Sequence, residues 1–229
     1  MRFYLVDCFA EAKYQGNELA VLIPDRLISD LEMQQIAREI NFSETAFILS
    51  EKKRDGGYDV RIFTPAVEVP FAGHPTLGTA YVIHDMLEDG KSTEVRLNLK
   101  AGQIPIRVDS DTLTMRQNQP TFGPVVDAAD VAECFHLAPE DIRGDYPVQL
   151  VSTGLESVIV PLKSLDALAK CAVDHIKFQT YIQEKFACNH LFFVDMGDGT
   201  LRARNIMEDP VFAEDPATGS ATAIWRDIC

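Results

Sequence analysis

The sequence predicts an α+β protein made of two similar lobes. Its 229 residues alternate short runs typical of β-strands with a few helix-sized segments. A stretch at residues 60–83 recurs in altered form at residues 201–224. Between the two copies, residues 117–126 hold two prolines and a glycine in a polar setting, which indicates a crossing between lobes. We therefore expect an N-terminal lobe over residues 1–118 and a C-terminal lobe over residues 119–229.

The individual elements follow from local patterns. Runs rich in β-branched and aromatic residues, bounded by turn residues, predict strands. Residues 29–40 carry apolar side chains at helical spacing, with Ser29 or Asp30 as a suitable N-cap. The expected strands are Phe3–Phe9, Glu18–Ile23, Thr45–Leu49, Tyr58–Phe63, Glu94–Leu99, Ile104–Val108, Thr112–Met115, Pro147–Val151, Glu156–Leu162, His190–Met196 and Leu201–Asn205. The expected helices are Ser29–Ile40, Pro75–Leu87, Ser164–Cys171, Val173–Lys185 and one that begins at Pro216.

The internal repeat is visible at an offset of 141 residues. Of the 24 residue pairs between 60–83 and 201–224, seven are identical, and they cluster around a proline and a glycine. The identical pairs are Arg61/Arg202, Phe71/Phe212, Ala72/Ala213, Pro75/Pro216, Gly78/Gly219, Ala80/Ala221 and Ile83/Ile224. Two copies of one α+β unit make a site between the copies the natural expectation.

The repeated loops suggest what such a site could bind. Each places a polar residue directly before proline, His74 in the first copy and Asp215 in the second. Proline is favoured at the first helical position, so each loop should lead into a helix N-terminus, whose free N–H groups attract a small anion. Taken singly, each loop is also a plain helix start, and a lone histidine is more often structural than catalytic.

Charge and composition exclude several classes of function. With 21 Lys+Arg against 35 Asp+Glu the net charge is −14, and there is no basic run. Binding to nucleic acid or to an anionic membrane is therefore not expected, because both need clustered cations. No apolar stretch approaches the roughly 20 residues that span a bilayer, and the N-terminus has no signal-peptide pattern, so we expect a cytoplasmic protein.

Cysteine and histidine spacing indicates neither a disulfide framework nor a metal site. The five cysteines are widely separated and form no C-x-x-C pair, so we interpret them as small buried hydrophobic residues. The five histidines show no H-E-x-x-H or similar ligand spacing. A G-x-S-x-G nucleophile motif is also missing from the sequence, which disfavours a hydrolase.

Four blocks, in the correct order along the chain, resemble the PhzF-like phenazine-biosynthesis family. The first holds Asp7 and Gly16–Val21, and the last is the run Glu-Asp-Pro-Ala-Thr-Gly-Ser-Ala at 214–221. The two middle blocks are Met33–Phe47, with Asn-Phe-Ser-Glu-Thr at 41–45, and Phe63–Gly78, with Ala-Gly-His-Pro at 72–75. Four ordered blocks are far more specific than any one of them.

The resemblance implies a fold and a set of catalytic residues. The fold is that of diaminopimelate epimerase, in which two similar lobes, each a curled, mostly antiparallel sheet around a central helix, enclose a cleft. In the family a glutamate moves a proton on a cyclic dihydro-hydroxyanthranilate, and the matching residue here is Glu44. The family's other site residues match His74, Asp215 and Ser220. The resemblance implies no metal, nucleotide or flavin.

These residue types suit proton transfer on a small carboxylated metabolite. A carboxylate enclosed in a cleft can take a proton from one carbon and return it to another. Ser43 is a further candidate for substrate binding, and Gly73 and Gly219 would let backbone N–H groups approach the substrate. Two alternatives stay open: Ser43 and Glu44 could cap a turn, and the protein could be a non-catalytic small-molecule-binding relative. Related cofactor-independent racemases use a cysteine pair at the two loops, and neither loop here contains cysteine.

The C-terminal copy is short by comparison with the first. The first copy continues for 30 residues beyond its helix, from Asp89 to Asn118, whereas the second stops at Cys229, nine residues after Ser220. We therefore expect a second lobe without its closing strands. An open sheet edge favours association, so a homodimer is also expected.

Overall fold

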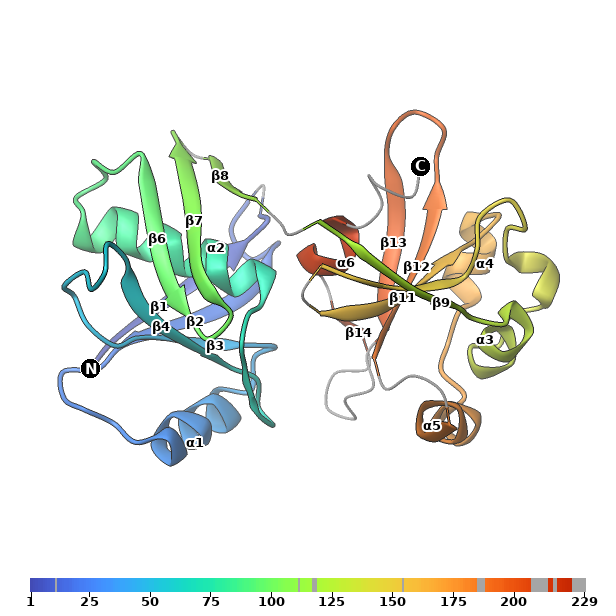
Figure 1. Cartoon of the computed structure of the whole chain (residues 1–229), viewed down its shortest axis with the longest axis horizontal. Coiled ribbons are helices and arrows are strands. Elements are labelled where there is room, and N and C mark those ends of the chain that lie inside the picture. Colours follow the sequence, from blue (N-terminus) through green and yellow to red (C-terminus); the bar gives the residue numbers. More distant parts are fainter. Residues whose placement is uncertain are drawn as a thin grey trace. The chain divides into compact units, whose positions relative to one another are not determined.

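A computed structural model describes residues 1–10, 12–110, 112–116, 119–153, 155–184, 188–206, 214–215 and 218–223. The chain folds as two compact units, Met1–Arg116 and Gln117–Cys229 (Figure 1). Each unit contains one sheet, and each sheet is mostly antiparallel, with parallel pairing only at β2–β3, β4–β6 and β11–β12 in the described residues. The mixed α+β class is confirmed.

The sheet of the N-terminal unit has the strand order β1-β2-β3-β4-β6-β7-β8, with β5 paired to β4. Nearly all of its expected strands are found within one or two residues. Its strands are β1 (Arg2–Cys8), β2 (Asn17–Ile23), β3 (Thr45–Ile48), β4 (Tyr58–Phe63), β5 (Glu68–Val69), β6 (Glu94–Leu99), β7 (Gly102–Asp109) and β8 (Thr112–Met115). The helices are α1 (Asp30–Ile40), α2 (Gly73–Val82) and the π-helical turn η1 (Ile83–Leu87) that continues α2.

Helix α2 lies in the concave side of this sheet. It contacts β1 and β2 at one end of the strand order and β8 at the other, which is possible only because the sheet curls around it. Eight of its ten residues are buried, so it has no solvent-facing stripe. Gly78 is required for this packing, because a Cβ there would lie 2.6 Å from Leu19 Cδ2 and 2.7 Å from Cys8 Sγ.

Helix α1 covers part of the opposite face of the same sheet. Its Met33 and Ala37 are buried and pack with Phe47 and Phe63, whose rings meet edge to face at 5.6 Å. The predicted cap is confirmed, since Ser29 Oγ accepts a hydrogen bond from the Glu32 amide at 3.2 Å. The helix ends at Asn41, which adopts the left-handed conformation (φ 60°).

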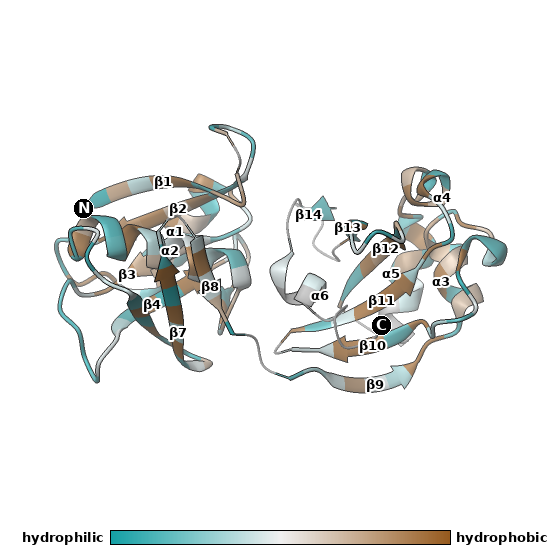
Figure 2. Ribbon diagram, turned by 90° about the horizontal axis from the view of Figure 1, so that it is seen from above, coloured by the Kyte–Doolittle hydropathy of each residue, from teal (hydrophilic) through white to brown (hydrophobic). Residues whose placement is uncertain are grey.

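The C-terminal unit holds a sheet of order β14-β13-β12-β11-β10-β9. Most of the brown, hydrophobic colour in both units follows the strands (Figure 2). The strands are β9 (Thr121–Val125), β10 (Gln149–Ser152), β11 (Glu156–Pro161), β12 (Asn189–Asp195), β13 (Leu201–Ile206) and β14 (Glu214–Asp215). The helices are α3 (Ala128–Cys134), the 3-10 turn η2 (Pro139–Asp141), α4 (Leu165–Lys170), α5 (His175–Glu184) and α6 (Gly219–Ala223).

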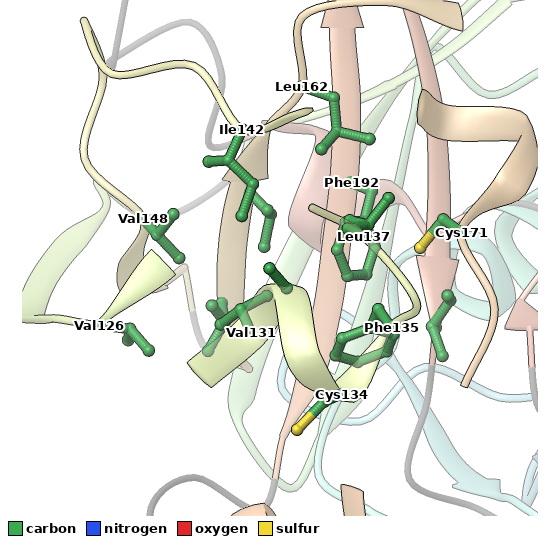
Figure 3. Close-up of a cluster of buried hydrophobic side chains, with 14 of the residues drawn as sticks. Val126, Val131, Cys134, Phe135, Leu137, Ile142, Val148, Leu162, Cys171 and Phe192 are labelled. Carbon is green, nitrogen blue, oxygen red and sulfur yellow. The ribbon is translucent and has the colours of Figure 1, made fainter. Parts of the chain in front are cut away.

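The two faces of this second sheet have separate cores. The larger core joins the sheet to α3, α4 and α5, and it includes Phe178. Its Phe135 and Phe192 are seen in Figure 3. The smaller core lies on the α6 side, where Ala221 packs with residues such as Leu191. The central helix of this unit is therefore α6, by analogy with α2 in the first.

One sequence expectation needs correction in this part of the chain, and several elements were not predicted. Residues 117–126 are not only a crossing, because β9 pairs with β10 as the edge strand, a position at which Pro124 is tolerated. Helix α3 and the two short strands β5 and β14 were not expected. The start of the last helix at Pro216 lies outside the described residues, and α6 is seen from Gly219. The end of the second lobe, at residues 224–229, also lies outside them.

The described helices include none that is long and apolar enough to cross a membrane. The buried thiols of Cys8, Cys134 and Cys171 agree with the interpretation of the cysteines as core residues, and Cys188 is half-buried.

Candidate active site

Glu44 and His74 meet in the N-terminal unit. Glu44 directly precedes β3, and His74 is the second residue of α2, which contacts β3. The Nε2 atom of His74 lies 3.6 Å from Oε2 of Glu44, and the two side chains are 4% and 18% exposed. A carboxylate with restricted solvent access beside an imidazole is an arrangement that can accept, hold and return a proton.

Asn17 contacts the other nitrogen of the same imidazole. Its Nδ2 lies 3.4 Å from Nδ1 of His74, and Asn17 is 2% exposed at the first position of β2. When the amide donates, Nδ1 is the acceptor and the ring proton resides on Nε2, toward Glu44. Sequence reasoning did not assign Asn17 a role. The available signal was a polar residue that opens a largely apolar strand directly after Gly16.

Gly16 brings this strand close to its neighbour. A Cβ at Gly16 would lie 2.4 Å from the carbonyl oxygen of Cys8, at the end of β1. No side chain fits there, so glycine lets β2 begin directly beside the end of β1, where Asn17 pairs with Cys8.

The start of α2 differs from the expectation. The helix begins at Gly73, with Ala72 as N-cap, so Pro75 is the third helical residue rather than the first. Within the described part of the chain no side chain caps this end, and Thr76 Oγ1 donates to the Ala72 carbonyl at 2.7 Å instead. His74 therefore sits within the first turn, where backbone N–H groups have no partner inside the helix and the dipole is positive.

A cysteine lies next to this site although neither repeated loop contains one. Cys8 Sγ donates weakly to the carbonyl of His74 at 3.6 Å. Burial, reinforced by the charges of Asp7 and Glu44, raises the pKa of the Cys8 thiol to about 12. The thiol stays protonated at neutral pH and is unsuited to act as a thiolate base.

Asp215 and Gly219 lie together in the C-terminal unit. Asp215 ends the short strand β14, and Gly219 begins α6 four residues later. Between them, Thr218 Oγ1 donates to the Asp215 carboxylate, and the Thr218 carbonyl accepts from the Thr222 amide at 3.1 Å. The side chain of Ser220 lies outside the described residues. Ser43 is half-buried directly before Glu44.

The structural repeat differs in register from the sequence repeat. Arg61 forms a two-pronged ion pair with Glu68 at 2.7 and 2.6 Å, and Arg204 forms the same pair with Glu214 at 2.8 and 2.7 Å. Arg61 lies two residues before Phe63, the cross-strand partner of Glu68. Arg204 likewise lies two residues before Ile206, the partner of Glu214. Arg61 thus corresponds to Arg204, not to Arg202.

The same correction applies to the helix starts. Gly73 and Gly219 are both first helical residues, which is an offset of 219 − 73 = 146 rather than 141. By position, His74 therefore corresponds to Ser220, and Asp215 belongs to the strand before the helix. The additional residues lie in the connection between strand and helix, where insertions are tolerated best.

Among the described residues, no group of three or more His, Cys, Asp or Glu side chains is placed to hold a metal ion. The candidate site residues instead offer a ligand carboxylates, an imidazole and the N–H groups of helix termini.

The fold is an α+β fold that solved epimerases share, and the candidate site joins a carboxylate with an imidazole in the first turn of a helix. A hydroxyproline epimerase from Agrobacterium vitis has the same fold, with a TM-score of 0.59 over 90% of this chain and 70% of that one, at 11% identity. A PhzF-family phenazine biosynthesis protein from Bacillus anthracis superposes with a TM-score of 0.84, at 26% identity, over 99% of this chain and 79% of that one.

Sequence comparison identifies the family. Residues 6–225 match the family described as phenazine biosynthesis-like protein (PhzC-PhzF). The chain is 34% identical to the uncharacterized isomerase YddE of Escherichia coli, over 95% of this chain and 75% of that protein. It is 32% identical to the trans-2,3-dihydro-3-hydroxyanthranilate isomerase of Pseudomonas aeruginosa, over 96% of this chain and 76% of that protein. The protein belongs to the PhzF-like family of isomerases.

Proposed function

We propose that the protein is a cofactor-independent isomerase that moves a proton between two carbons of a small carboxylated metabolite. The observation that supports this proposal is the Glu44–His74 pair, in which a largely buried carboxylate lies 3.6 Å from an imidazole. Glu44 takes the proton from one carbon and returns it to another. His74, neutral and protonated on Nε2, donates to the carboxylate or to a polar group of the substrate during the transfer.

The positive end of α2 supports the choice of an acid as substrate. The amide of Gly73 lies at the first helical position, and the helix dipole there stabilises a carboxylate. The proposal extends to Asp215, Gly219 and Ser220, which bind polar groups of a substrate, and to Ser43 beside Glu44. The names of the relatives support a hydroxylated, amino-substituted ring acid as the first compound to test.

The proposal also covers assembly and placement in the cell. We propose a homodimer in the cytoplasm, and a boundary between two independently folded lobes near residue 118. Size-exclusion chromatography with light scattering distinguishes a dimer of about twice 25.5 kDa from a monomer.

Incubation in deuterium oxide tests the catalytic proposal. With trans-2,3-dihydro-3-hydroxyanthranilate as probe, the wild type should incorporate deuterium into carbon-bound positions as it forms the isomer. Glu44→Gln keeps the size and burial of the side chain but cannot accept the proton, so exchange should fall by about 10²-fold or more. Glu39→Gln, on the exposed side of α1, is the matched control and should exchange at the wild-type rate.

The alternative, a small-molecule-binding relative without catalysis, predicts a different result. Such a protein would bind the acid and leave its carbon-bound hydrogens unexchanged in wild type and variants alike. Wild-type exchange that persists in Glu44→Gln would instead remove Glu44 from the catalytic role.

A further inference from the structure

Asn205 carries a buried amide that no described group of the protein satisfies. The residue is 3% exposed in β13, and among the described residues neither its Oδ1 nor its Nδ2 has a hydrogen-bond partner. An unmade hydrogen bond leaves a buried polar group with the full cost of its desolvation, and apolar side chains fill equivalent positions at no such cost. An amide whose two ends are both unsatisfied by the described residues is therefore a candidate group for binding a ligand.

The strand register places this amide beside Asp215. Asn205 is the direct cross-strand partner of Asp215 in β14 and of Leu191 in β12, so the three side chains share one face of the sheet. Leu191 belongs to the small core that includes Ala221 of α6. Asn205 and Asp215 therefore lie on the α6 side, with Cβ atoms about 5 Å apart as in any directly opposed pair.

The hydrogen-bonding groups of Asn205 and Asp215 determine which ligand these two residues can bind. Asp215 is an acceptor when ionised, and its carboxylate can accept more than one hydrogen bond, including the one from Thr218. Asn205 adds one acceptor and two N–H donors. A carboxylate placed here would be repelled by Asp215, whereas a hydroxyl group donates to Asp215 and accepts from Asn205, and an ammonium group donates to both.

We propose that Asn205 is a specificity-determining residue that, together with Asp215, binds a hydroxyl or amino substituent of a small carboxylic acid. The inference rests on the proposed function in taking this acid as the substrate. It assigns the recognition of the substituent to the C-terminal unit.

Calorimetric titration with matched pairs of acids tests the inference. The probes are 3-hydroxyanthranilate and anthranilate against benzoate, and malate and aspartate against succinate. The wild type should bind at least one substituted acid about tenfold more tightly than its unsubstituted partner. Asn205→Leu, which has nearly the same volume, should lose this preference while its affinity for benzoate and succinate stays within about twofold.

A second buried polar atom supplies the control. Ser157 Oγ is also fully buried, and no described residue forms a hydrogen bond with it, but Ser157 pairs with Val151 rather than with Asp215. Ser157→Ala should keep the wild-type preference. Asn205→Leu should fold at least as stably as the wild type, because it removes an unsatisfied amide. If it does not, Asn205→Ser provides the same comparison with a shorter side chain.

The outcomes separate this inference from the catalytic one. A preference that survives in Asn205→Leu, or a wild type that binds no substituted acid more tightly than its partner, overturns the role of Asn205. If the preference depends on Asn205 but no acid exchanges deuterium, the binding inference stands and the isomerase proposal fails. If an acid exchanges deuterium but the binding preference does not depend on Asn205, the isomerase proposal stands and the binding inference fails.

Discussion

The amide nitrogen of Asn17 lies 3.4 Å from Nδ1 of His74, at the start of a strand 57 residues before the histidine. The contact links the first residues of β2 to the first turn of α2. It orients the imidazole so that Nε2 faces the carboxylate of Glu44 at 3.6 Å. When the Asn17 amide donates to Nδ1, the ring proton of His74 lies on Nε2, toward Glu44.

Replacing Asn17 should alter the tautomer of His74. In Asn17→Leu the imidazole loses its donor at Nδ1, so the share of the Nδ1–H tautomer should rise and the exchange rate should fall by about tenfold or more. Nitrogen-15 spectra of the labelled histidine measure the tautomer directly. An unchanged histidine spectrum together with reduced exchange would mean that Asn17 acts only through stability, which urea unfolding would reveal.

Cys8 should be dispensable for catalysis. Its thiol is buried against the His74 carbonyl with a pKa of about 12, so it is not a thiolate at neutral pH. Cys8→Ala should keep deuterium exchange within about threefold of wild type and lower stability by about 1 kcal/mol, through a small cavity. Loss of exchange by about a hundredfold in a folded Cys8→Ala protein would show that the thiol takes part in the reaction.

Gly78 should resist replacement although it lies within a helix. Alanine has the higher helix propensity by about 1 kcal/mol, but its Cβ would meet Leu19 and Cys8 at 2.6 and 2.7 Å. We expect Gly78→Ala to destabilise the protein by about 1–3 kcal/mol through overpacking. Gly144→Ala is the control, since a Cβ there meets nothing within 4 Å, and its unfolding free energy should change by less than about 0.5 kcal/mol.

The stability of the C-terminal unit should depend on pH through His190. This histidine is fully buried among Phe135, Phe178 and Tyr181, and its Nδ1 donates to the Cys188 carbonyl at 3.0 Å. Burial lowers its pKa from 6.5 to about 4. Between pH 6.5 and 4 the unfolded chain therefore binds a proton that the folded chain does not, and stability falls as the pH falls through this range.

Urea unfolding at pH 7 and pH 5 measures this effect. A pKa of about 4 in the folded state predicts a loss of about 2 kcal/mol between the two values that is attributable to His190. In His190→Phe, which keeps an aromatic ring in the cluster, the difference between pH 7 and pH 5 should shrink by that amount. Equal differences in wild type and variant would contradict the assignment.

The sequence anticipated most of the regular elements, because their patterns are local. Runs of β-branched and aromatic residues bounded by turn residues identified strands such as Tyr58–Phe63 with both bounds correct, and the Ser29 cap marked the start of α1 within one residue. The two-residue strands β5 and β14 have too little sequence to carry a pattern, and they exist because tertiary pairing with β4 and β13 orders them. The edge strand β9 was not predicted, because its proline was interpreted as part of a crossing between lobes.

The candidate site was predicted in part. Glu44 and His74 were singled out by family resemblance, and the structure brings these two together. Asn17 and Asn205 were overlooked, since a polar residue near the end of a strand has the same sequence appearance whether it faces solvent or lies buried beside another candidate site residue. The predicted equivalence of His74 with Asp215 was wrong in register, because insertions between strand and helix shift the alignment without changing the packing.

By itself the sequence determined the α+β class, the presence of a repeat and the family, and it supplied the candidate site residues, since hydrophobic periodicity and motif order are properties of the chain. Only the tertiary structure decided which side chains lie on the same face of a sheet and how far apart they are. The Glu44–His74–Asn17 contact joins residues up to 57 positions apart. The burial of Asn205 beside Asp215 depends on strand register, and no local pattern encodes either relationship.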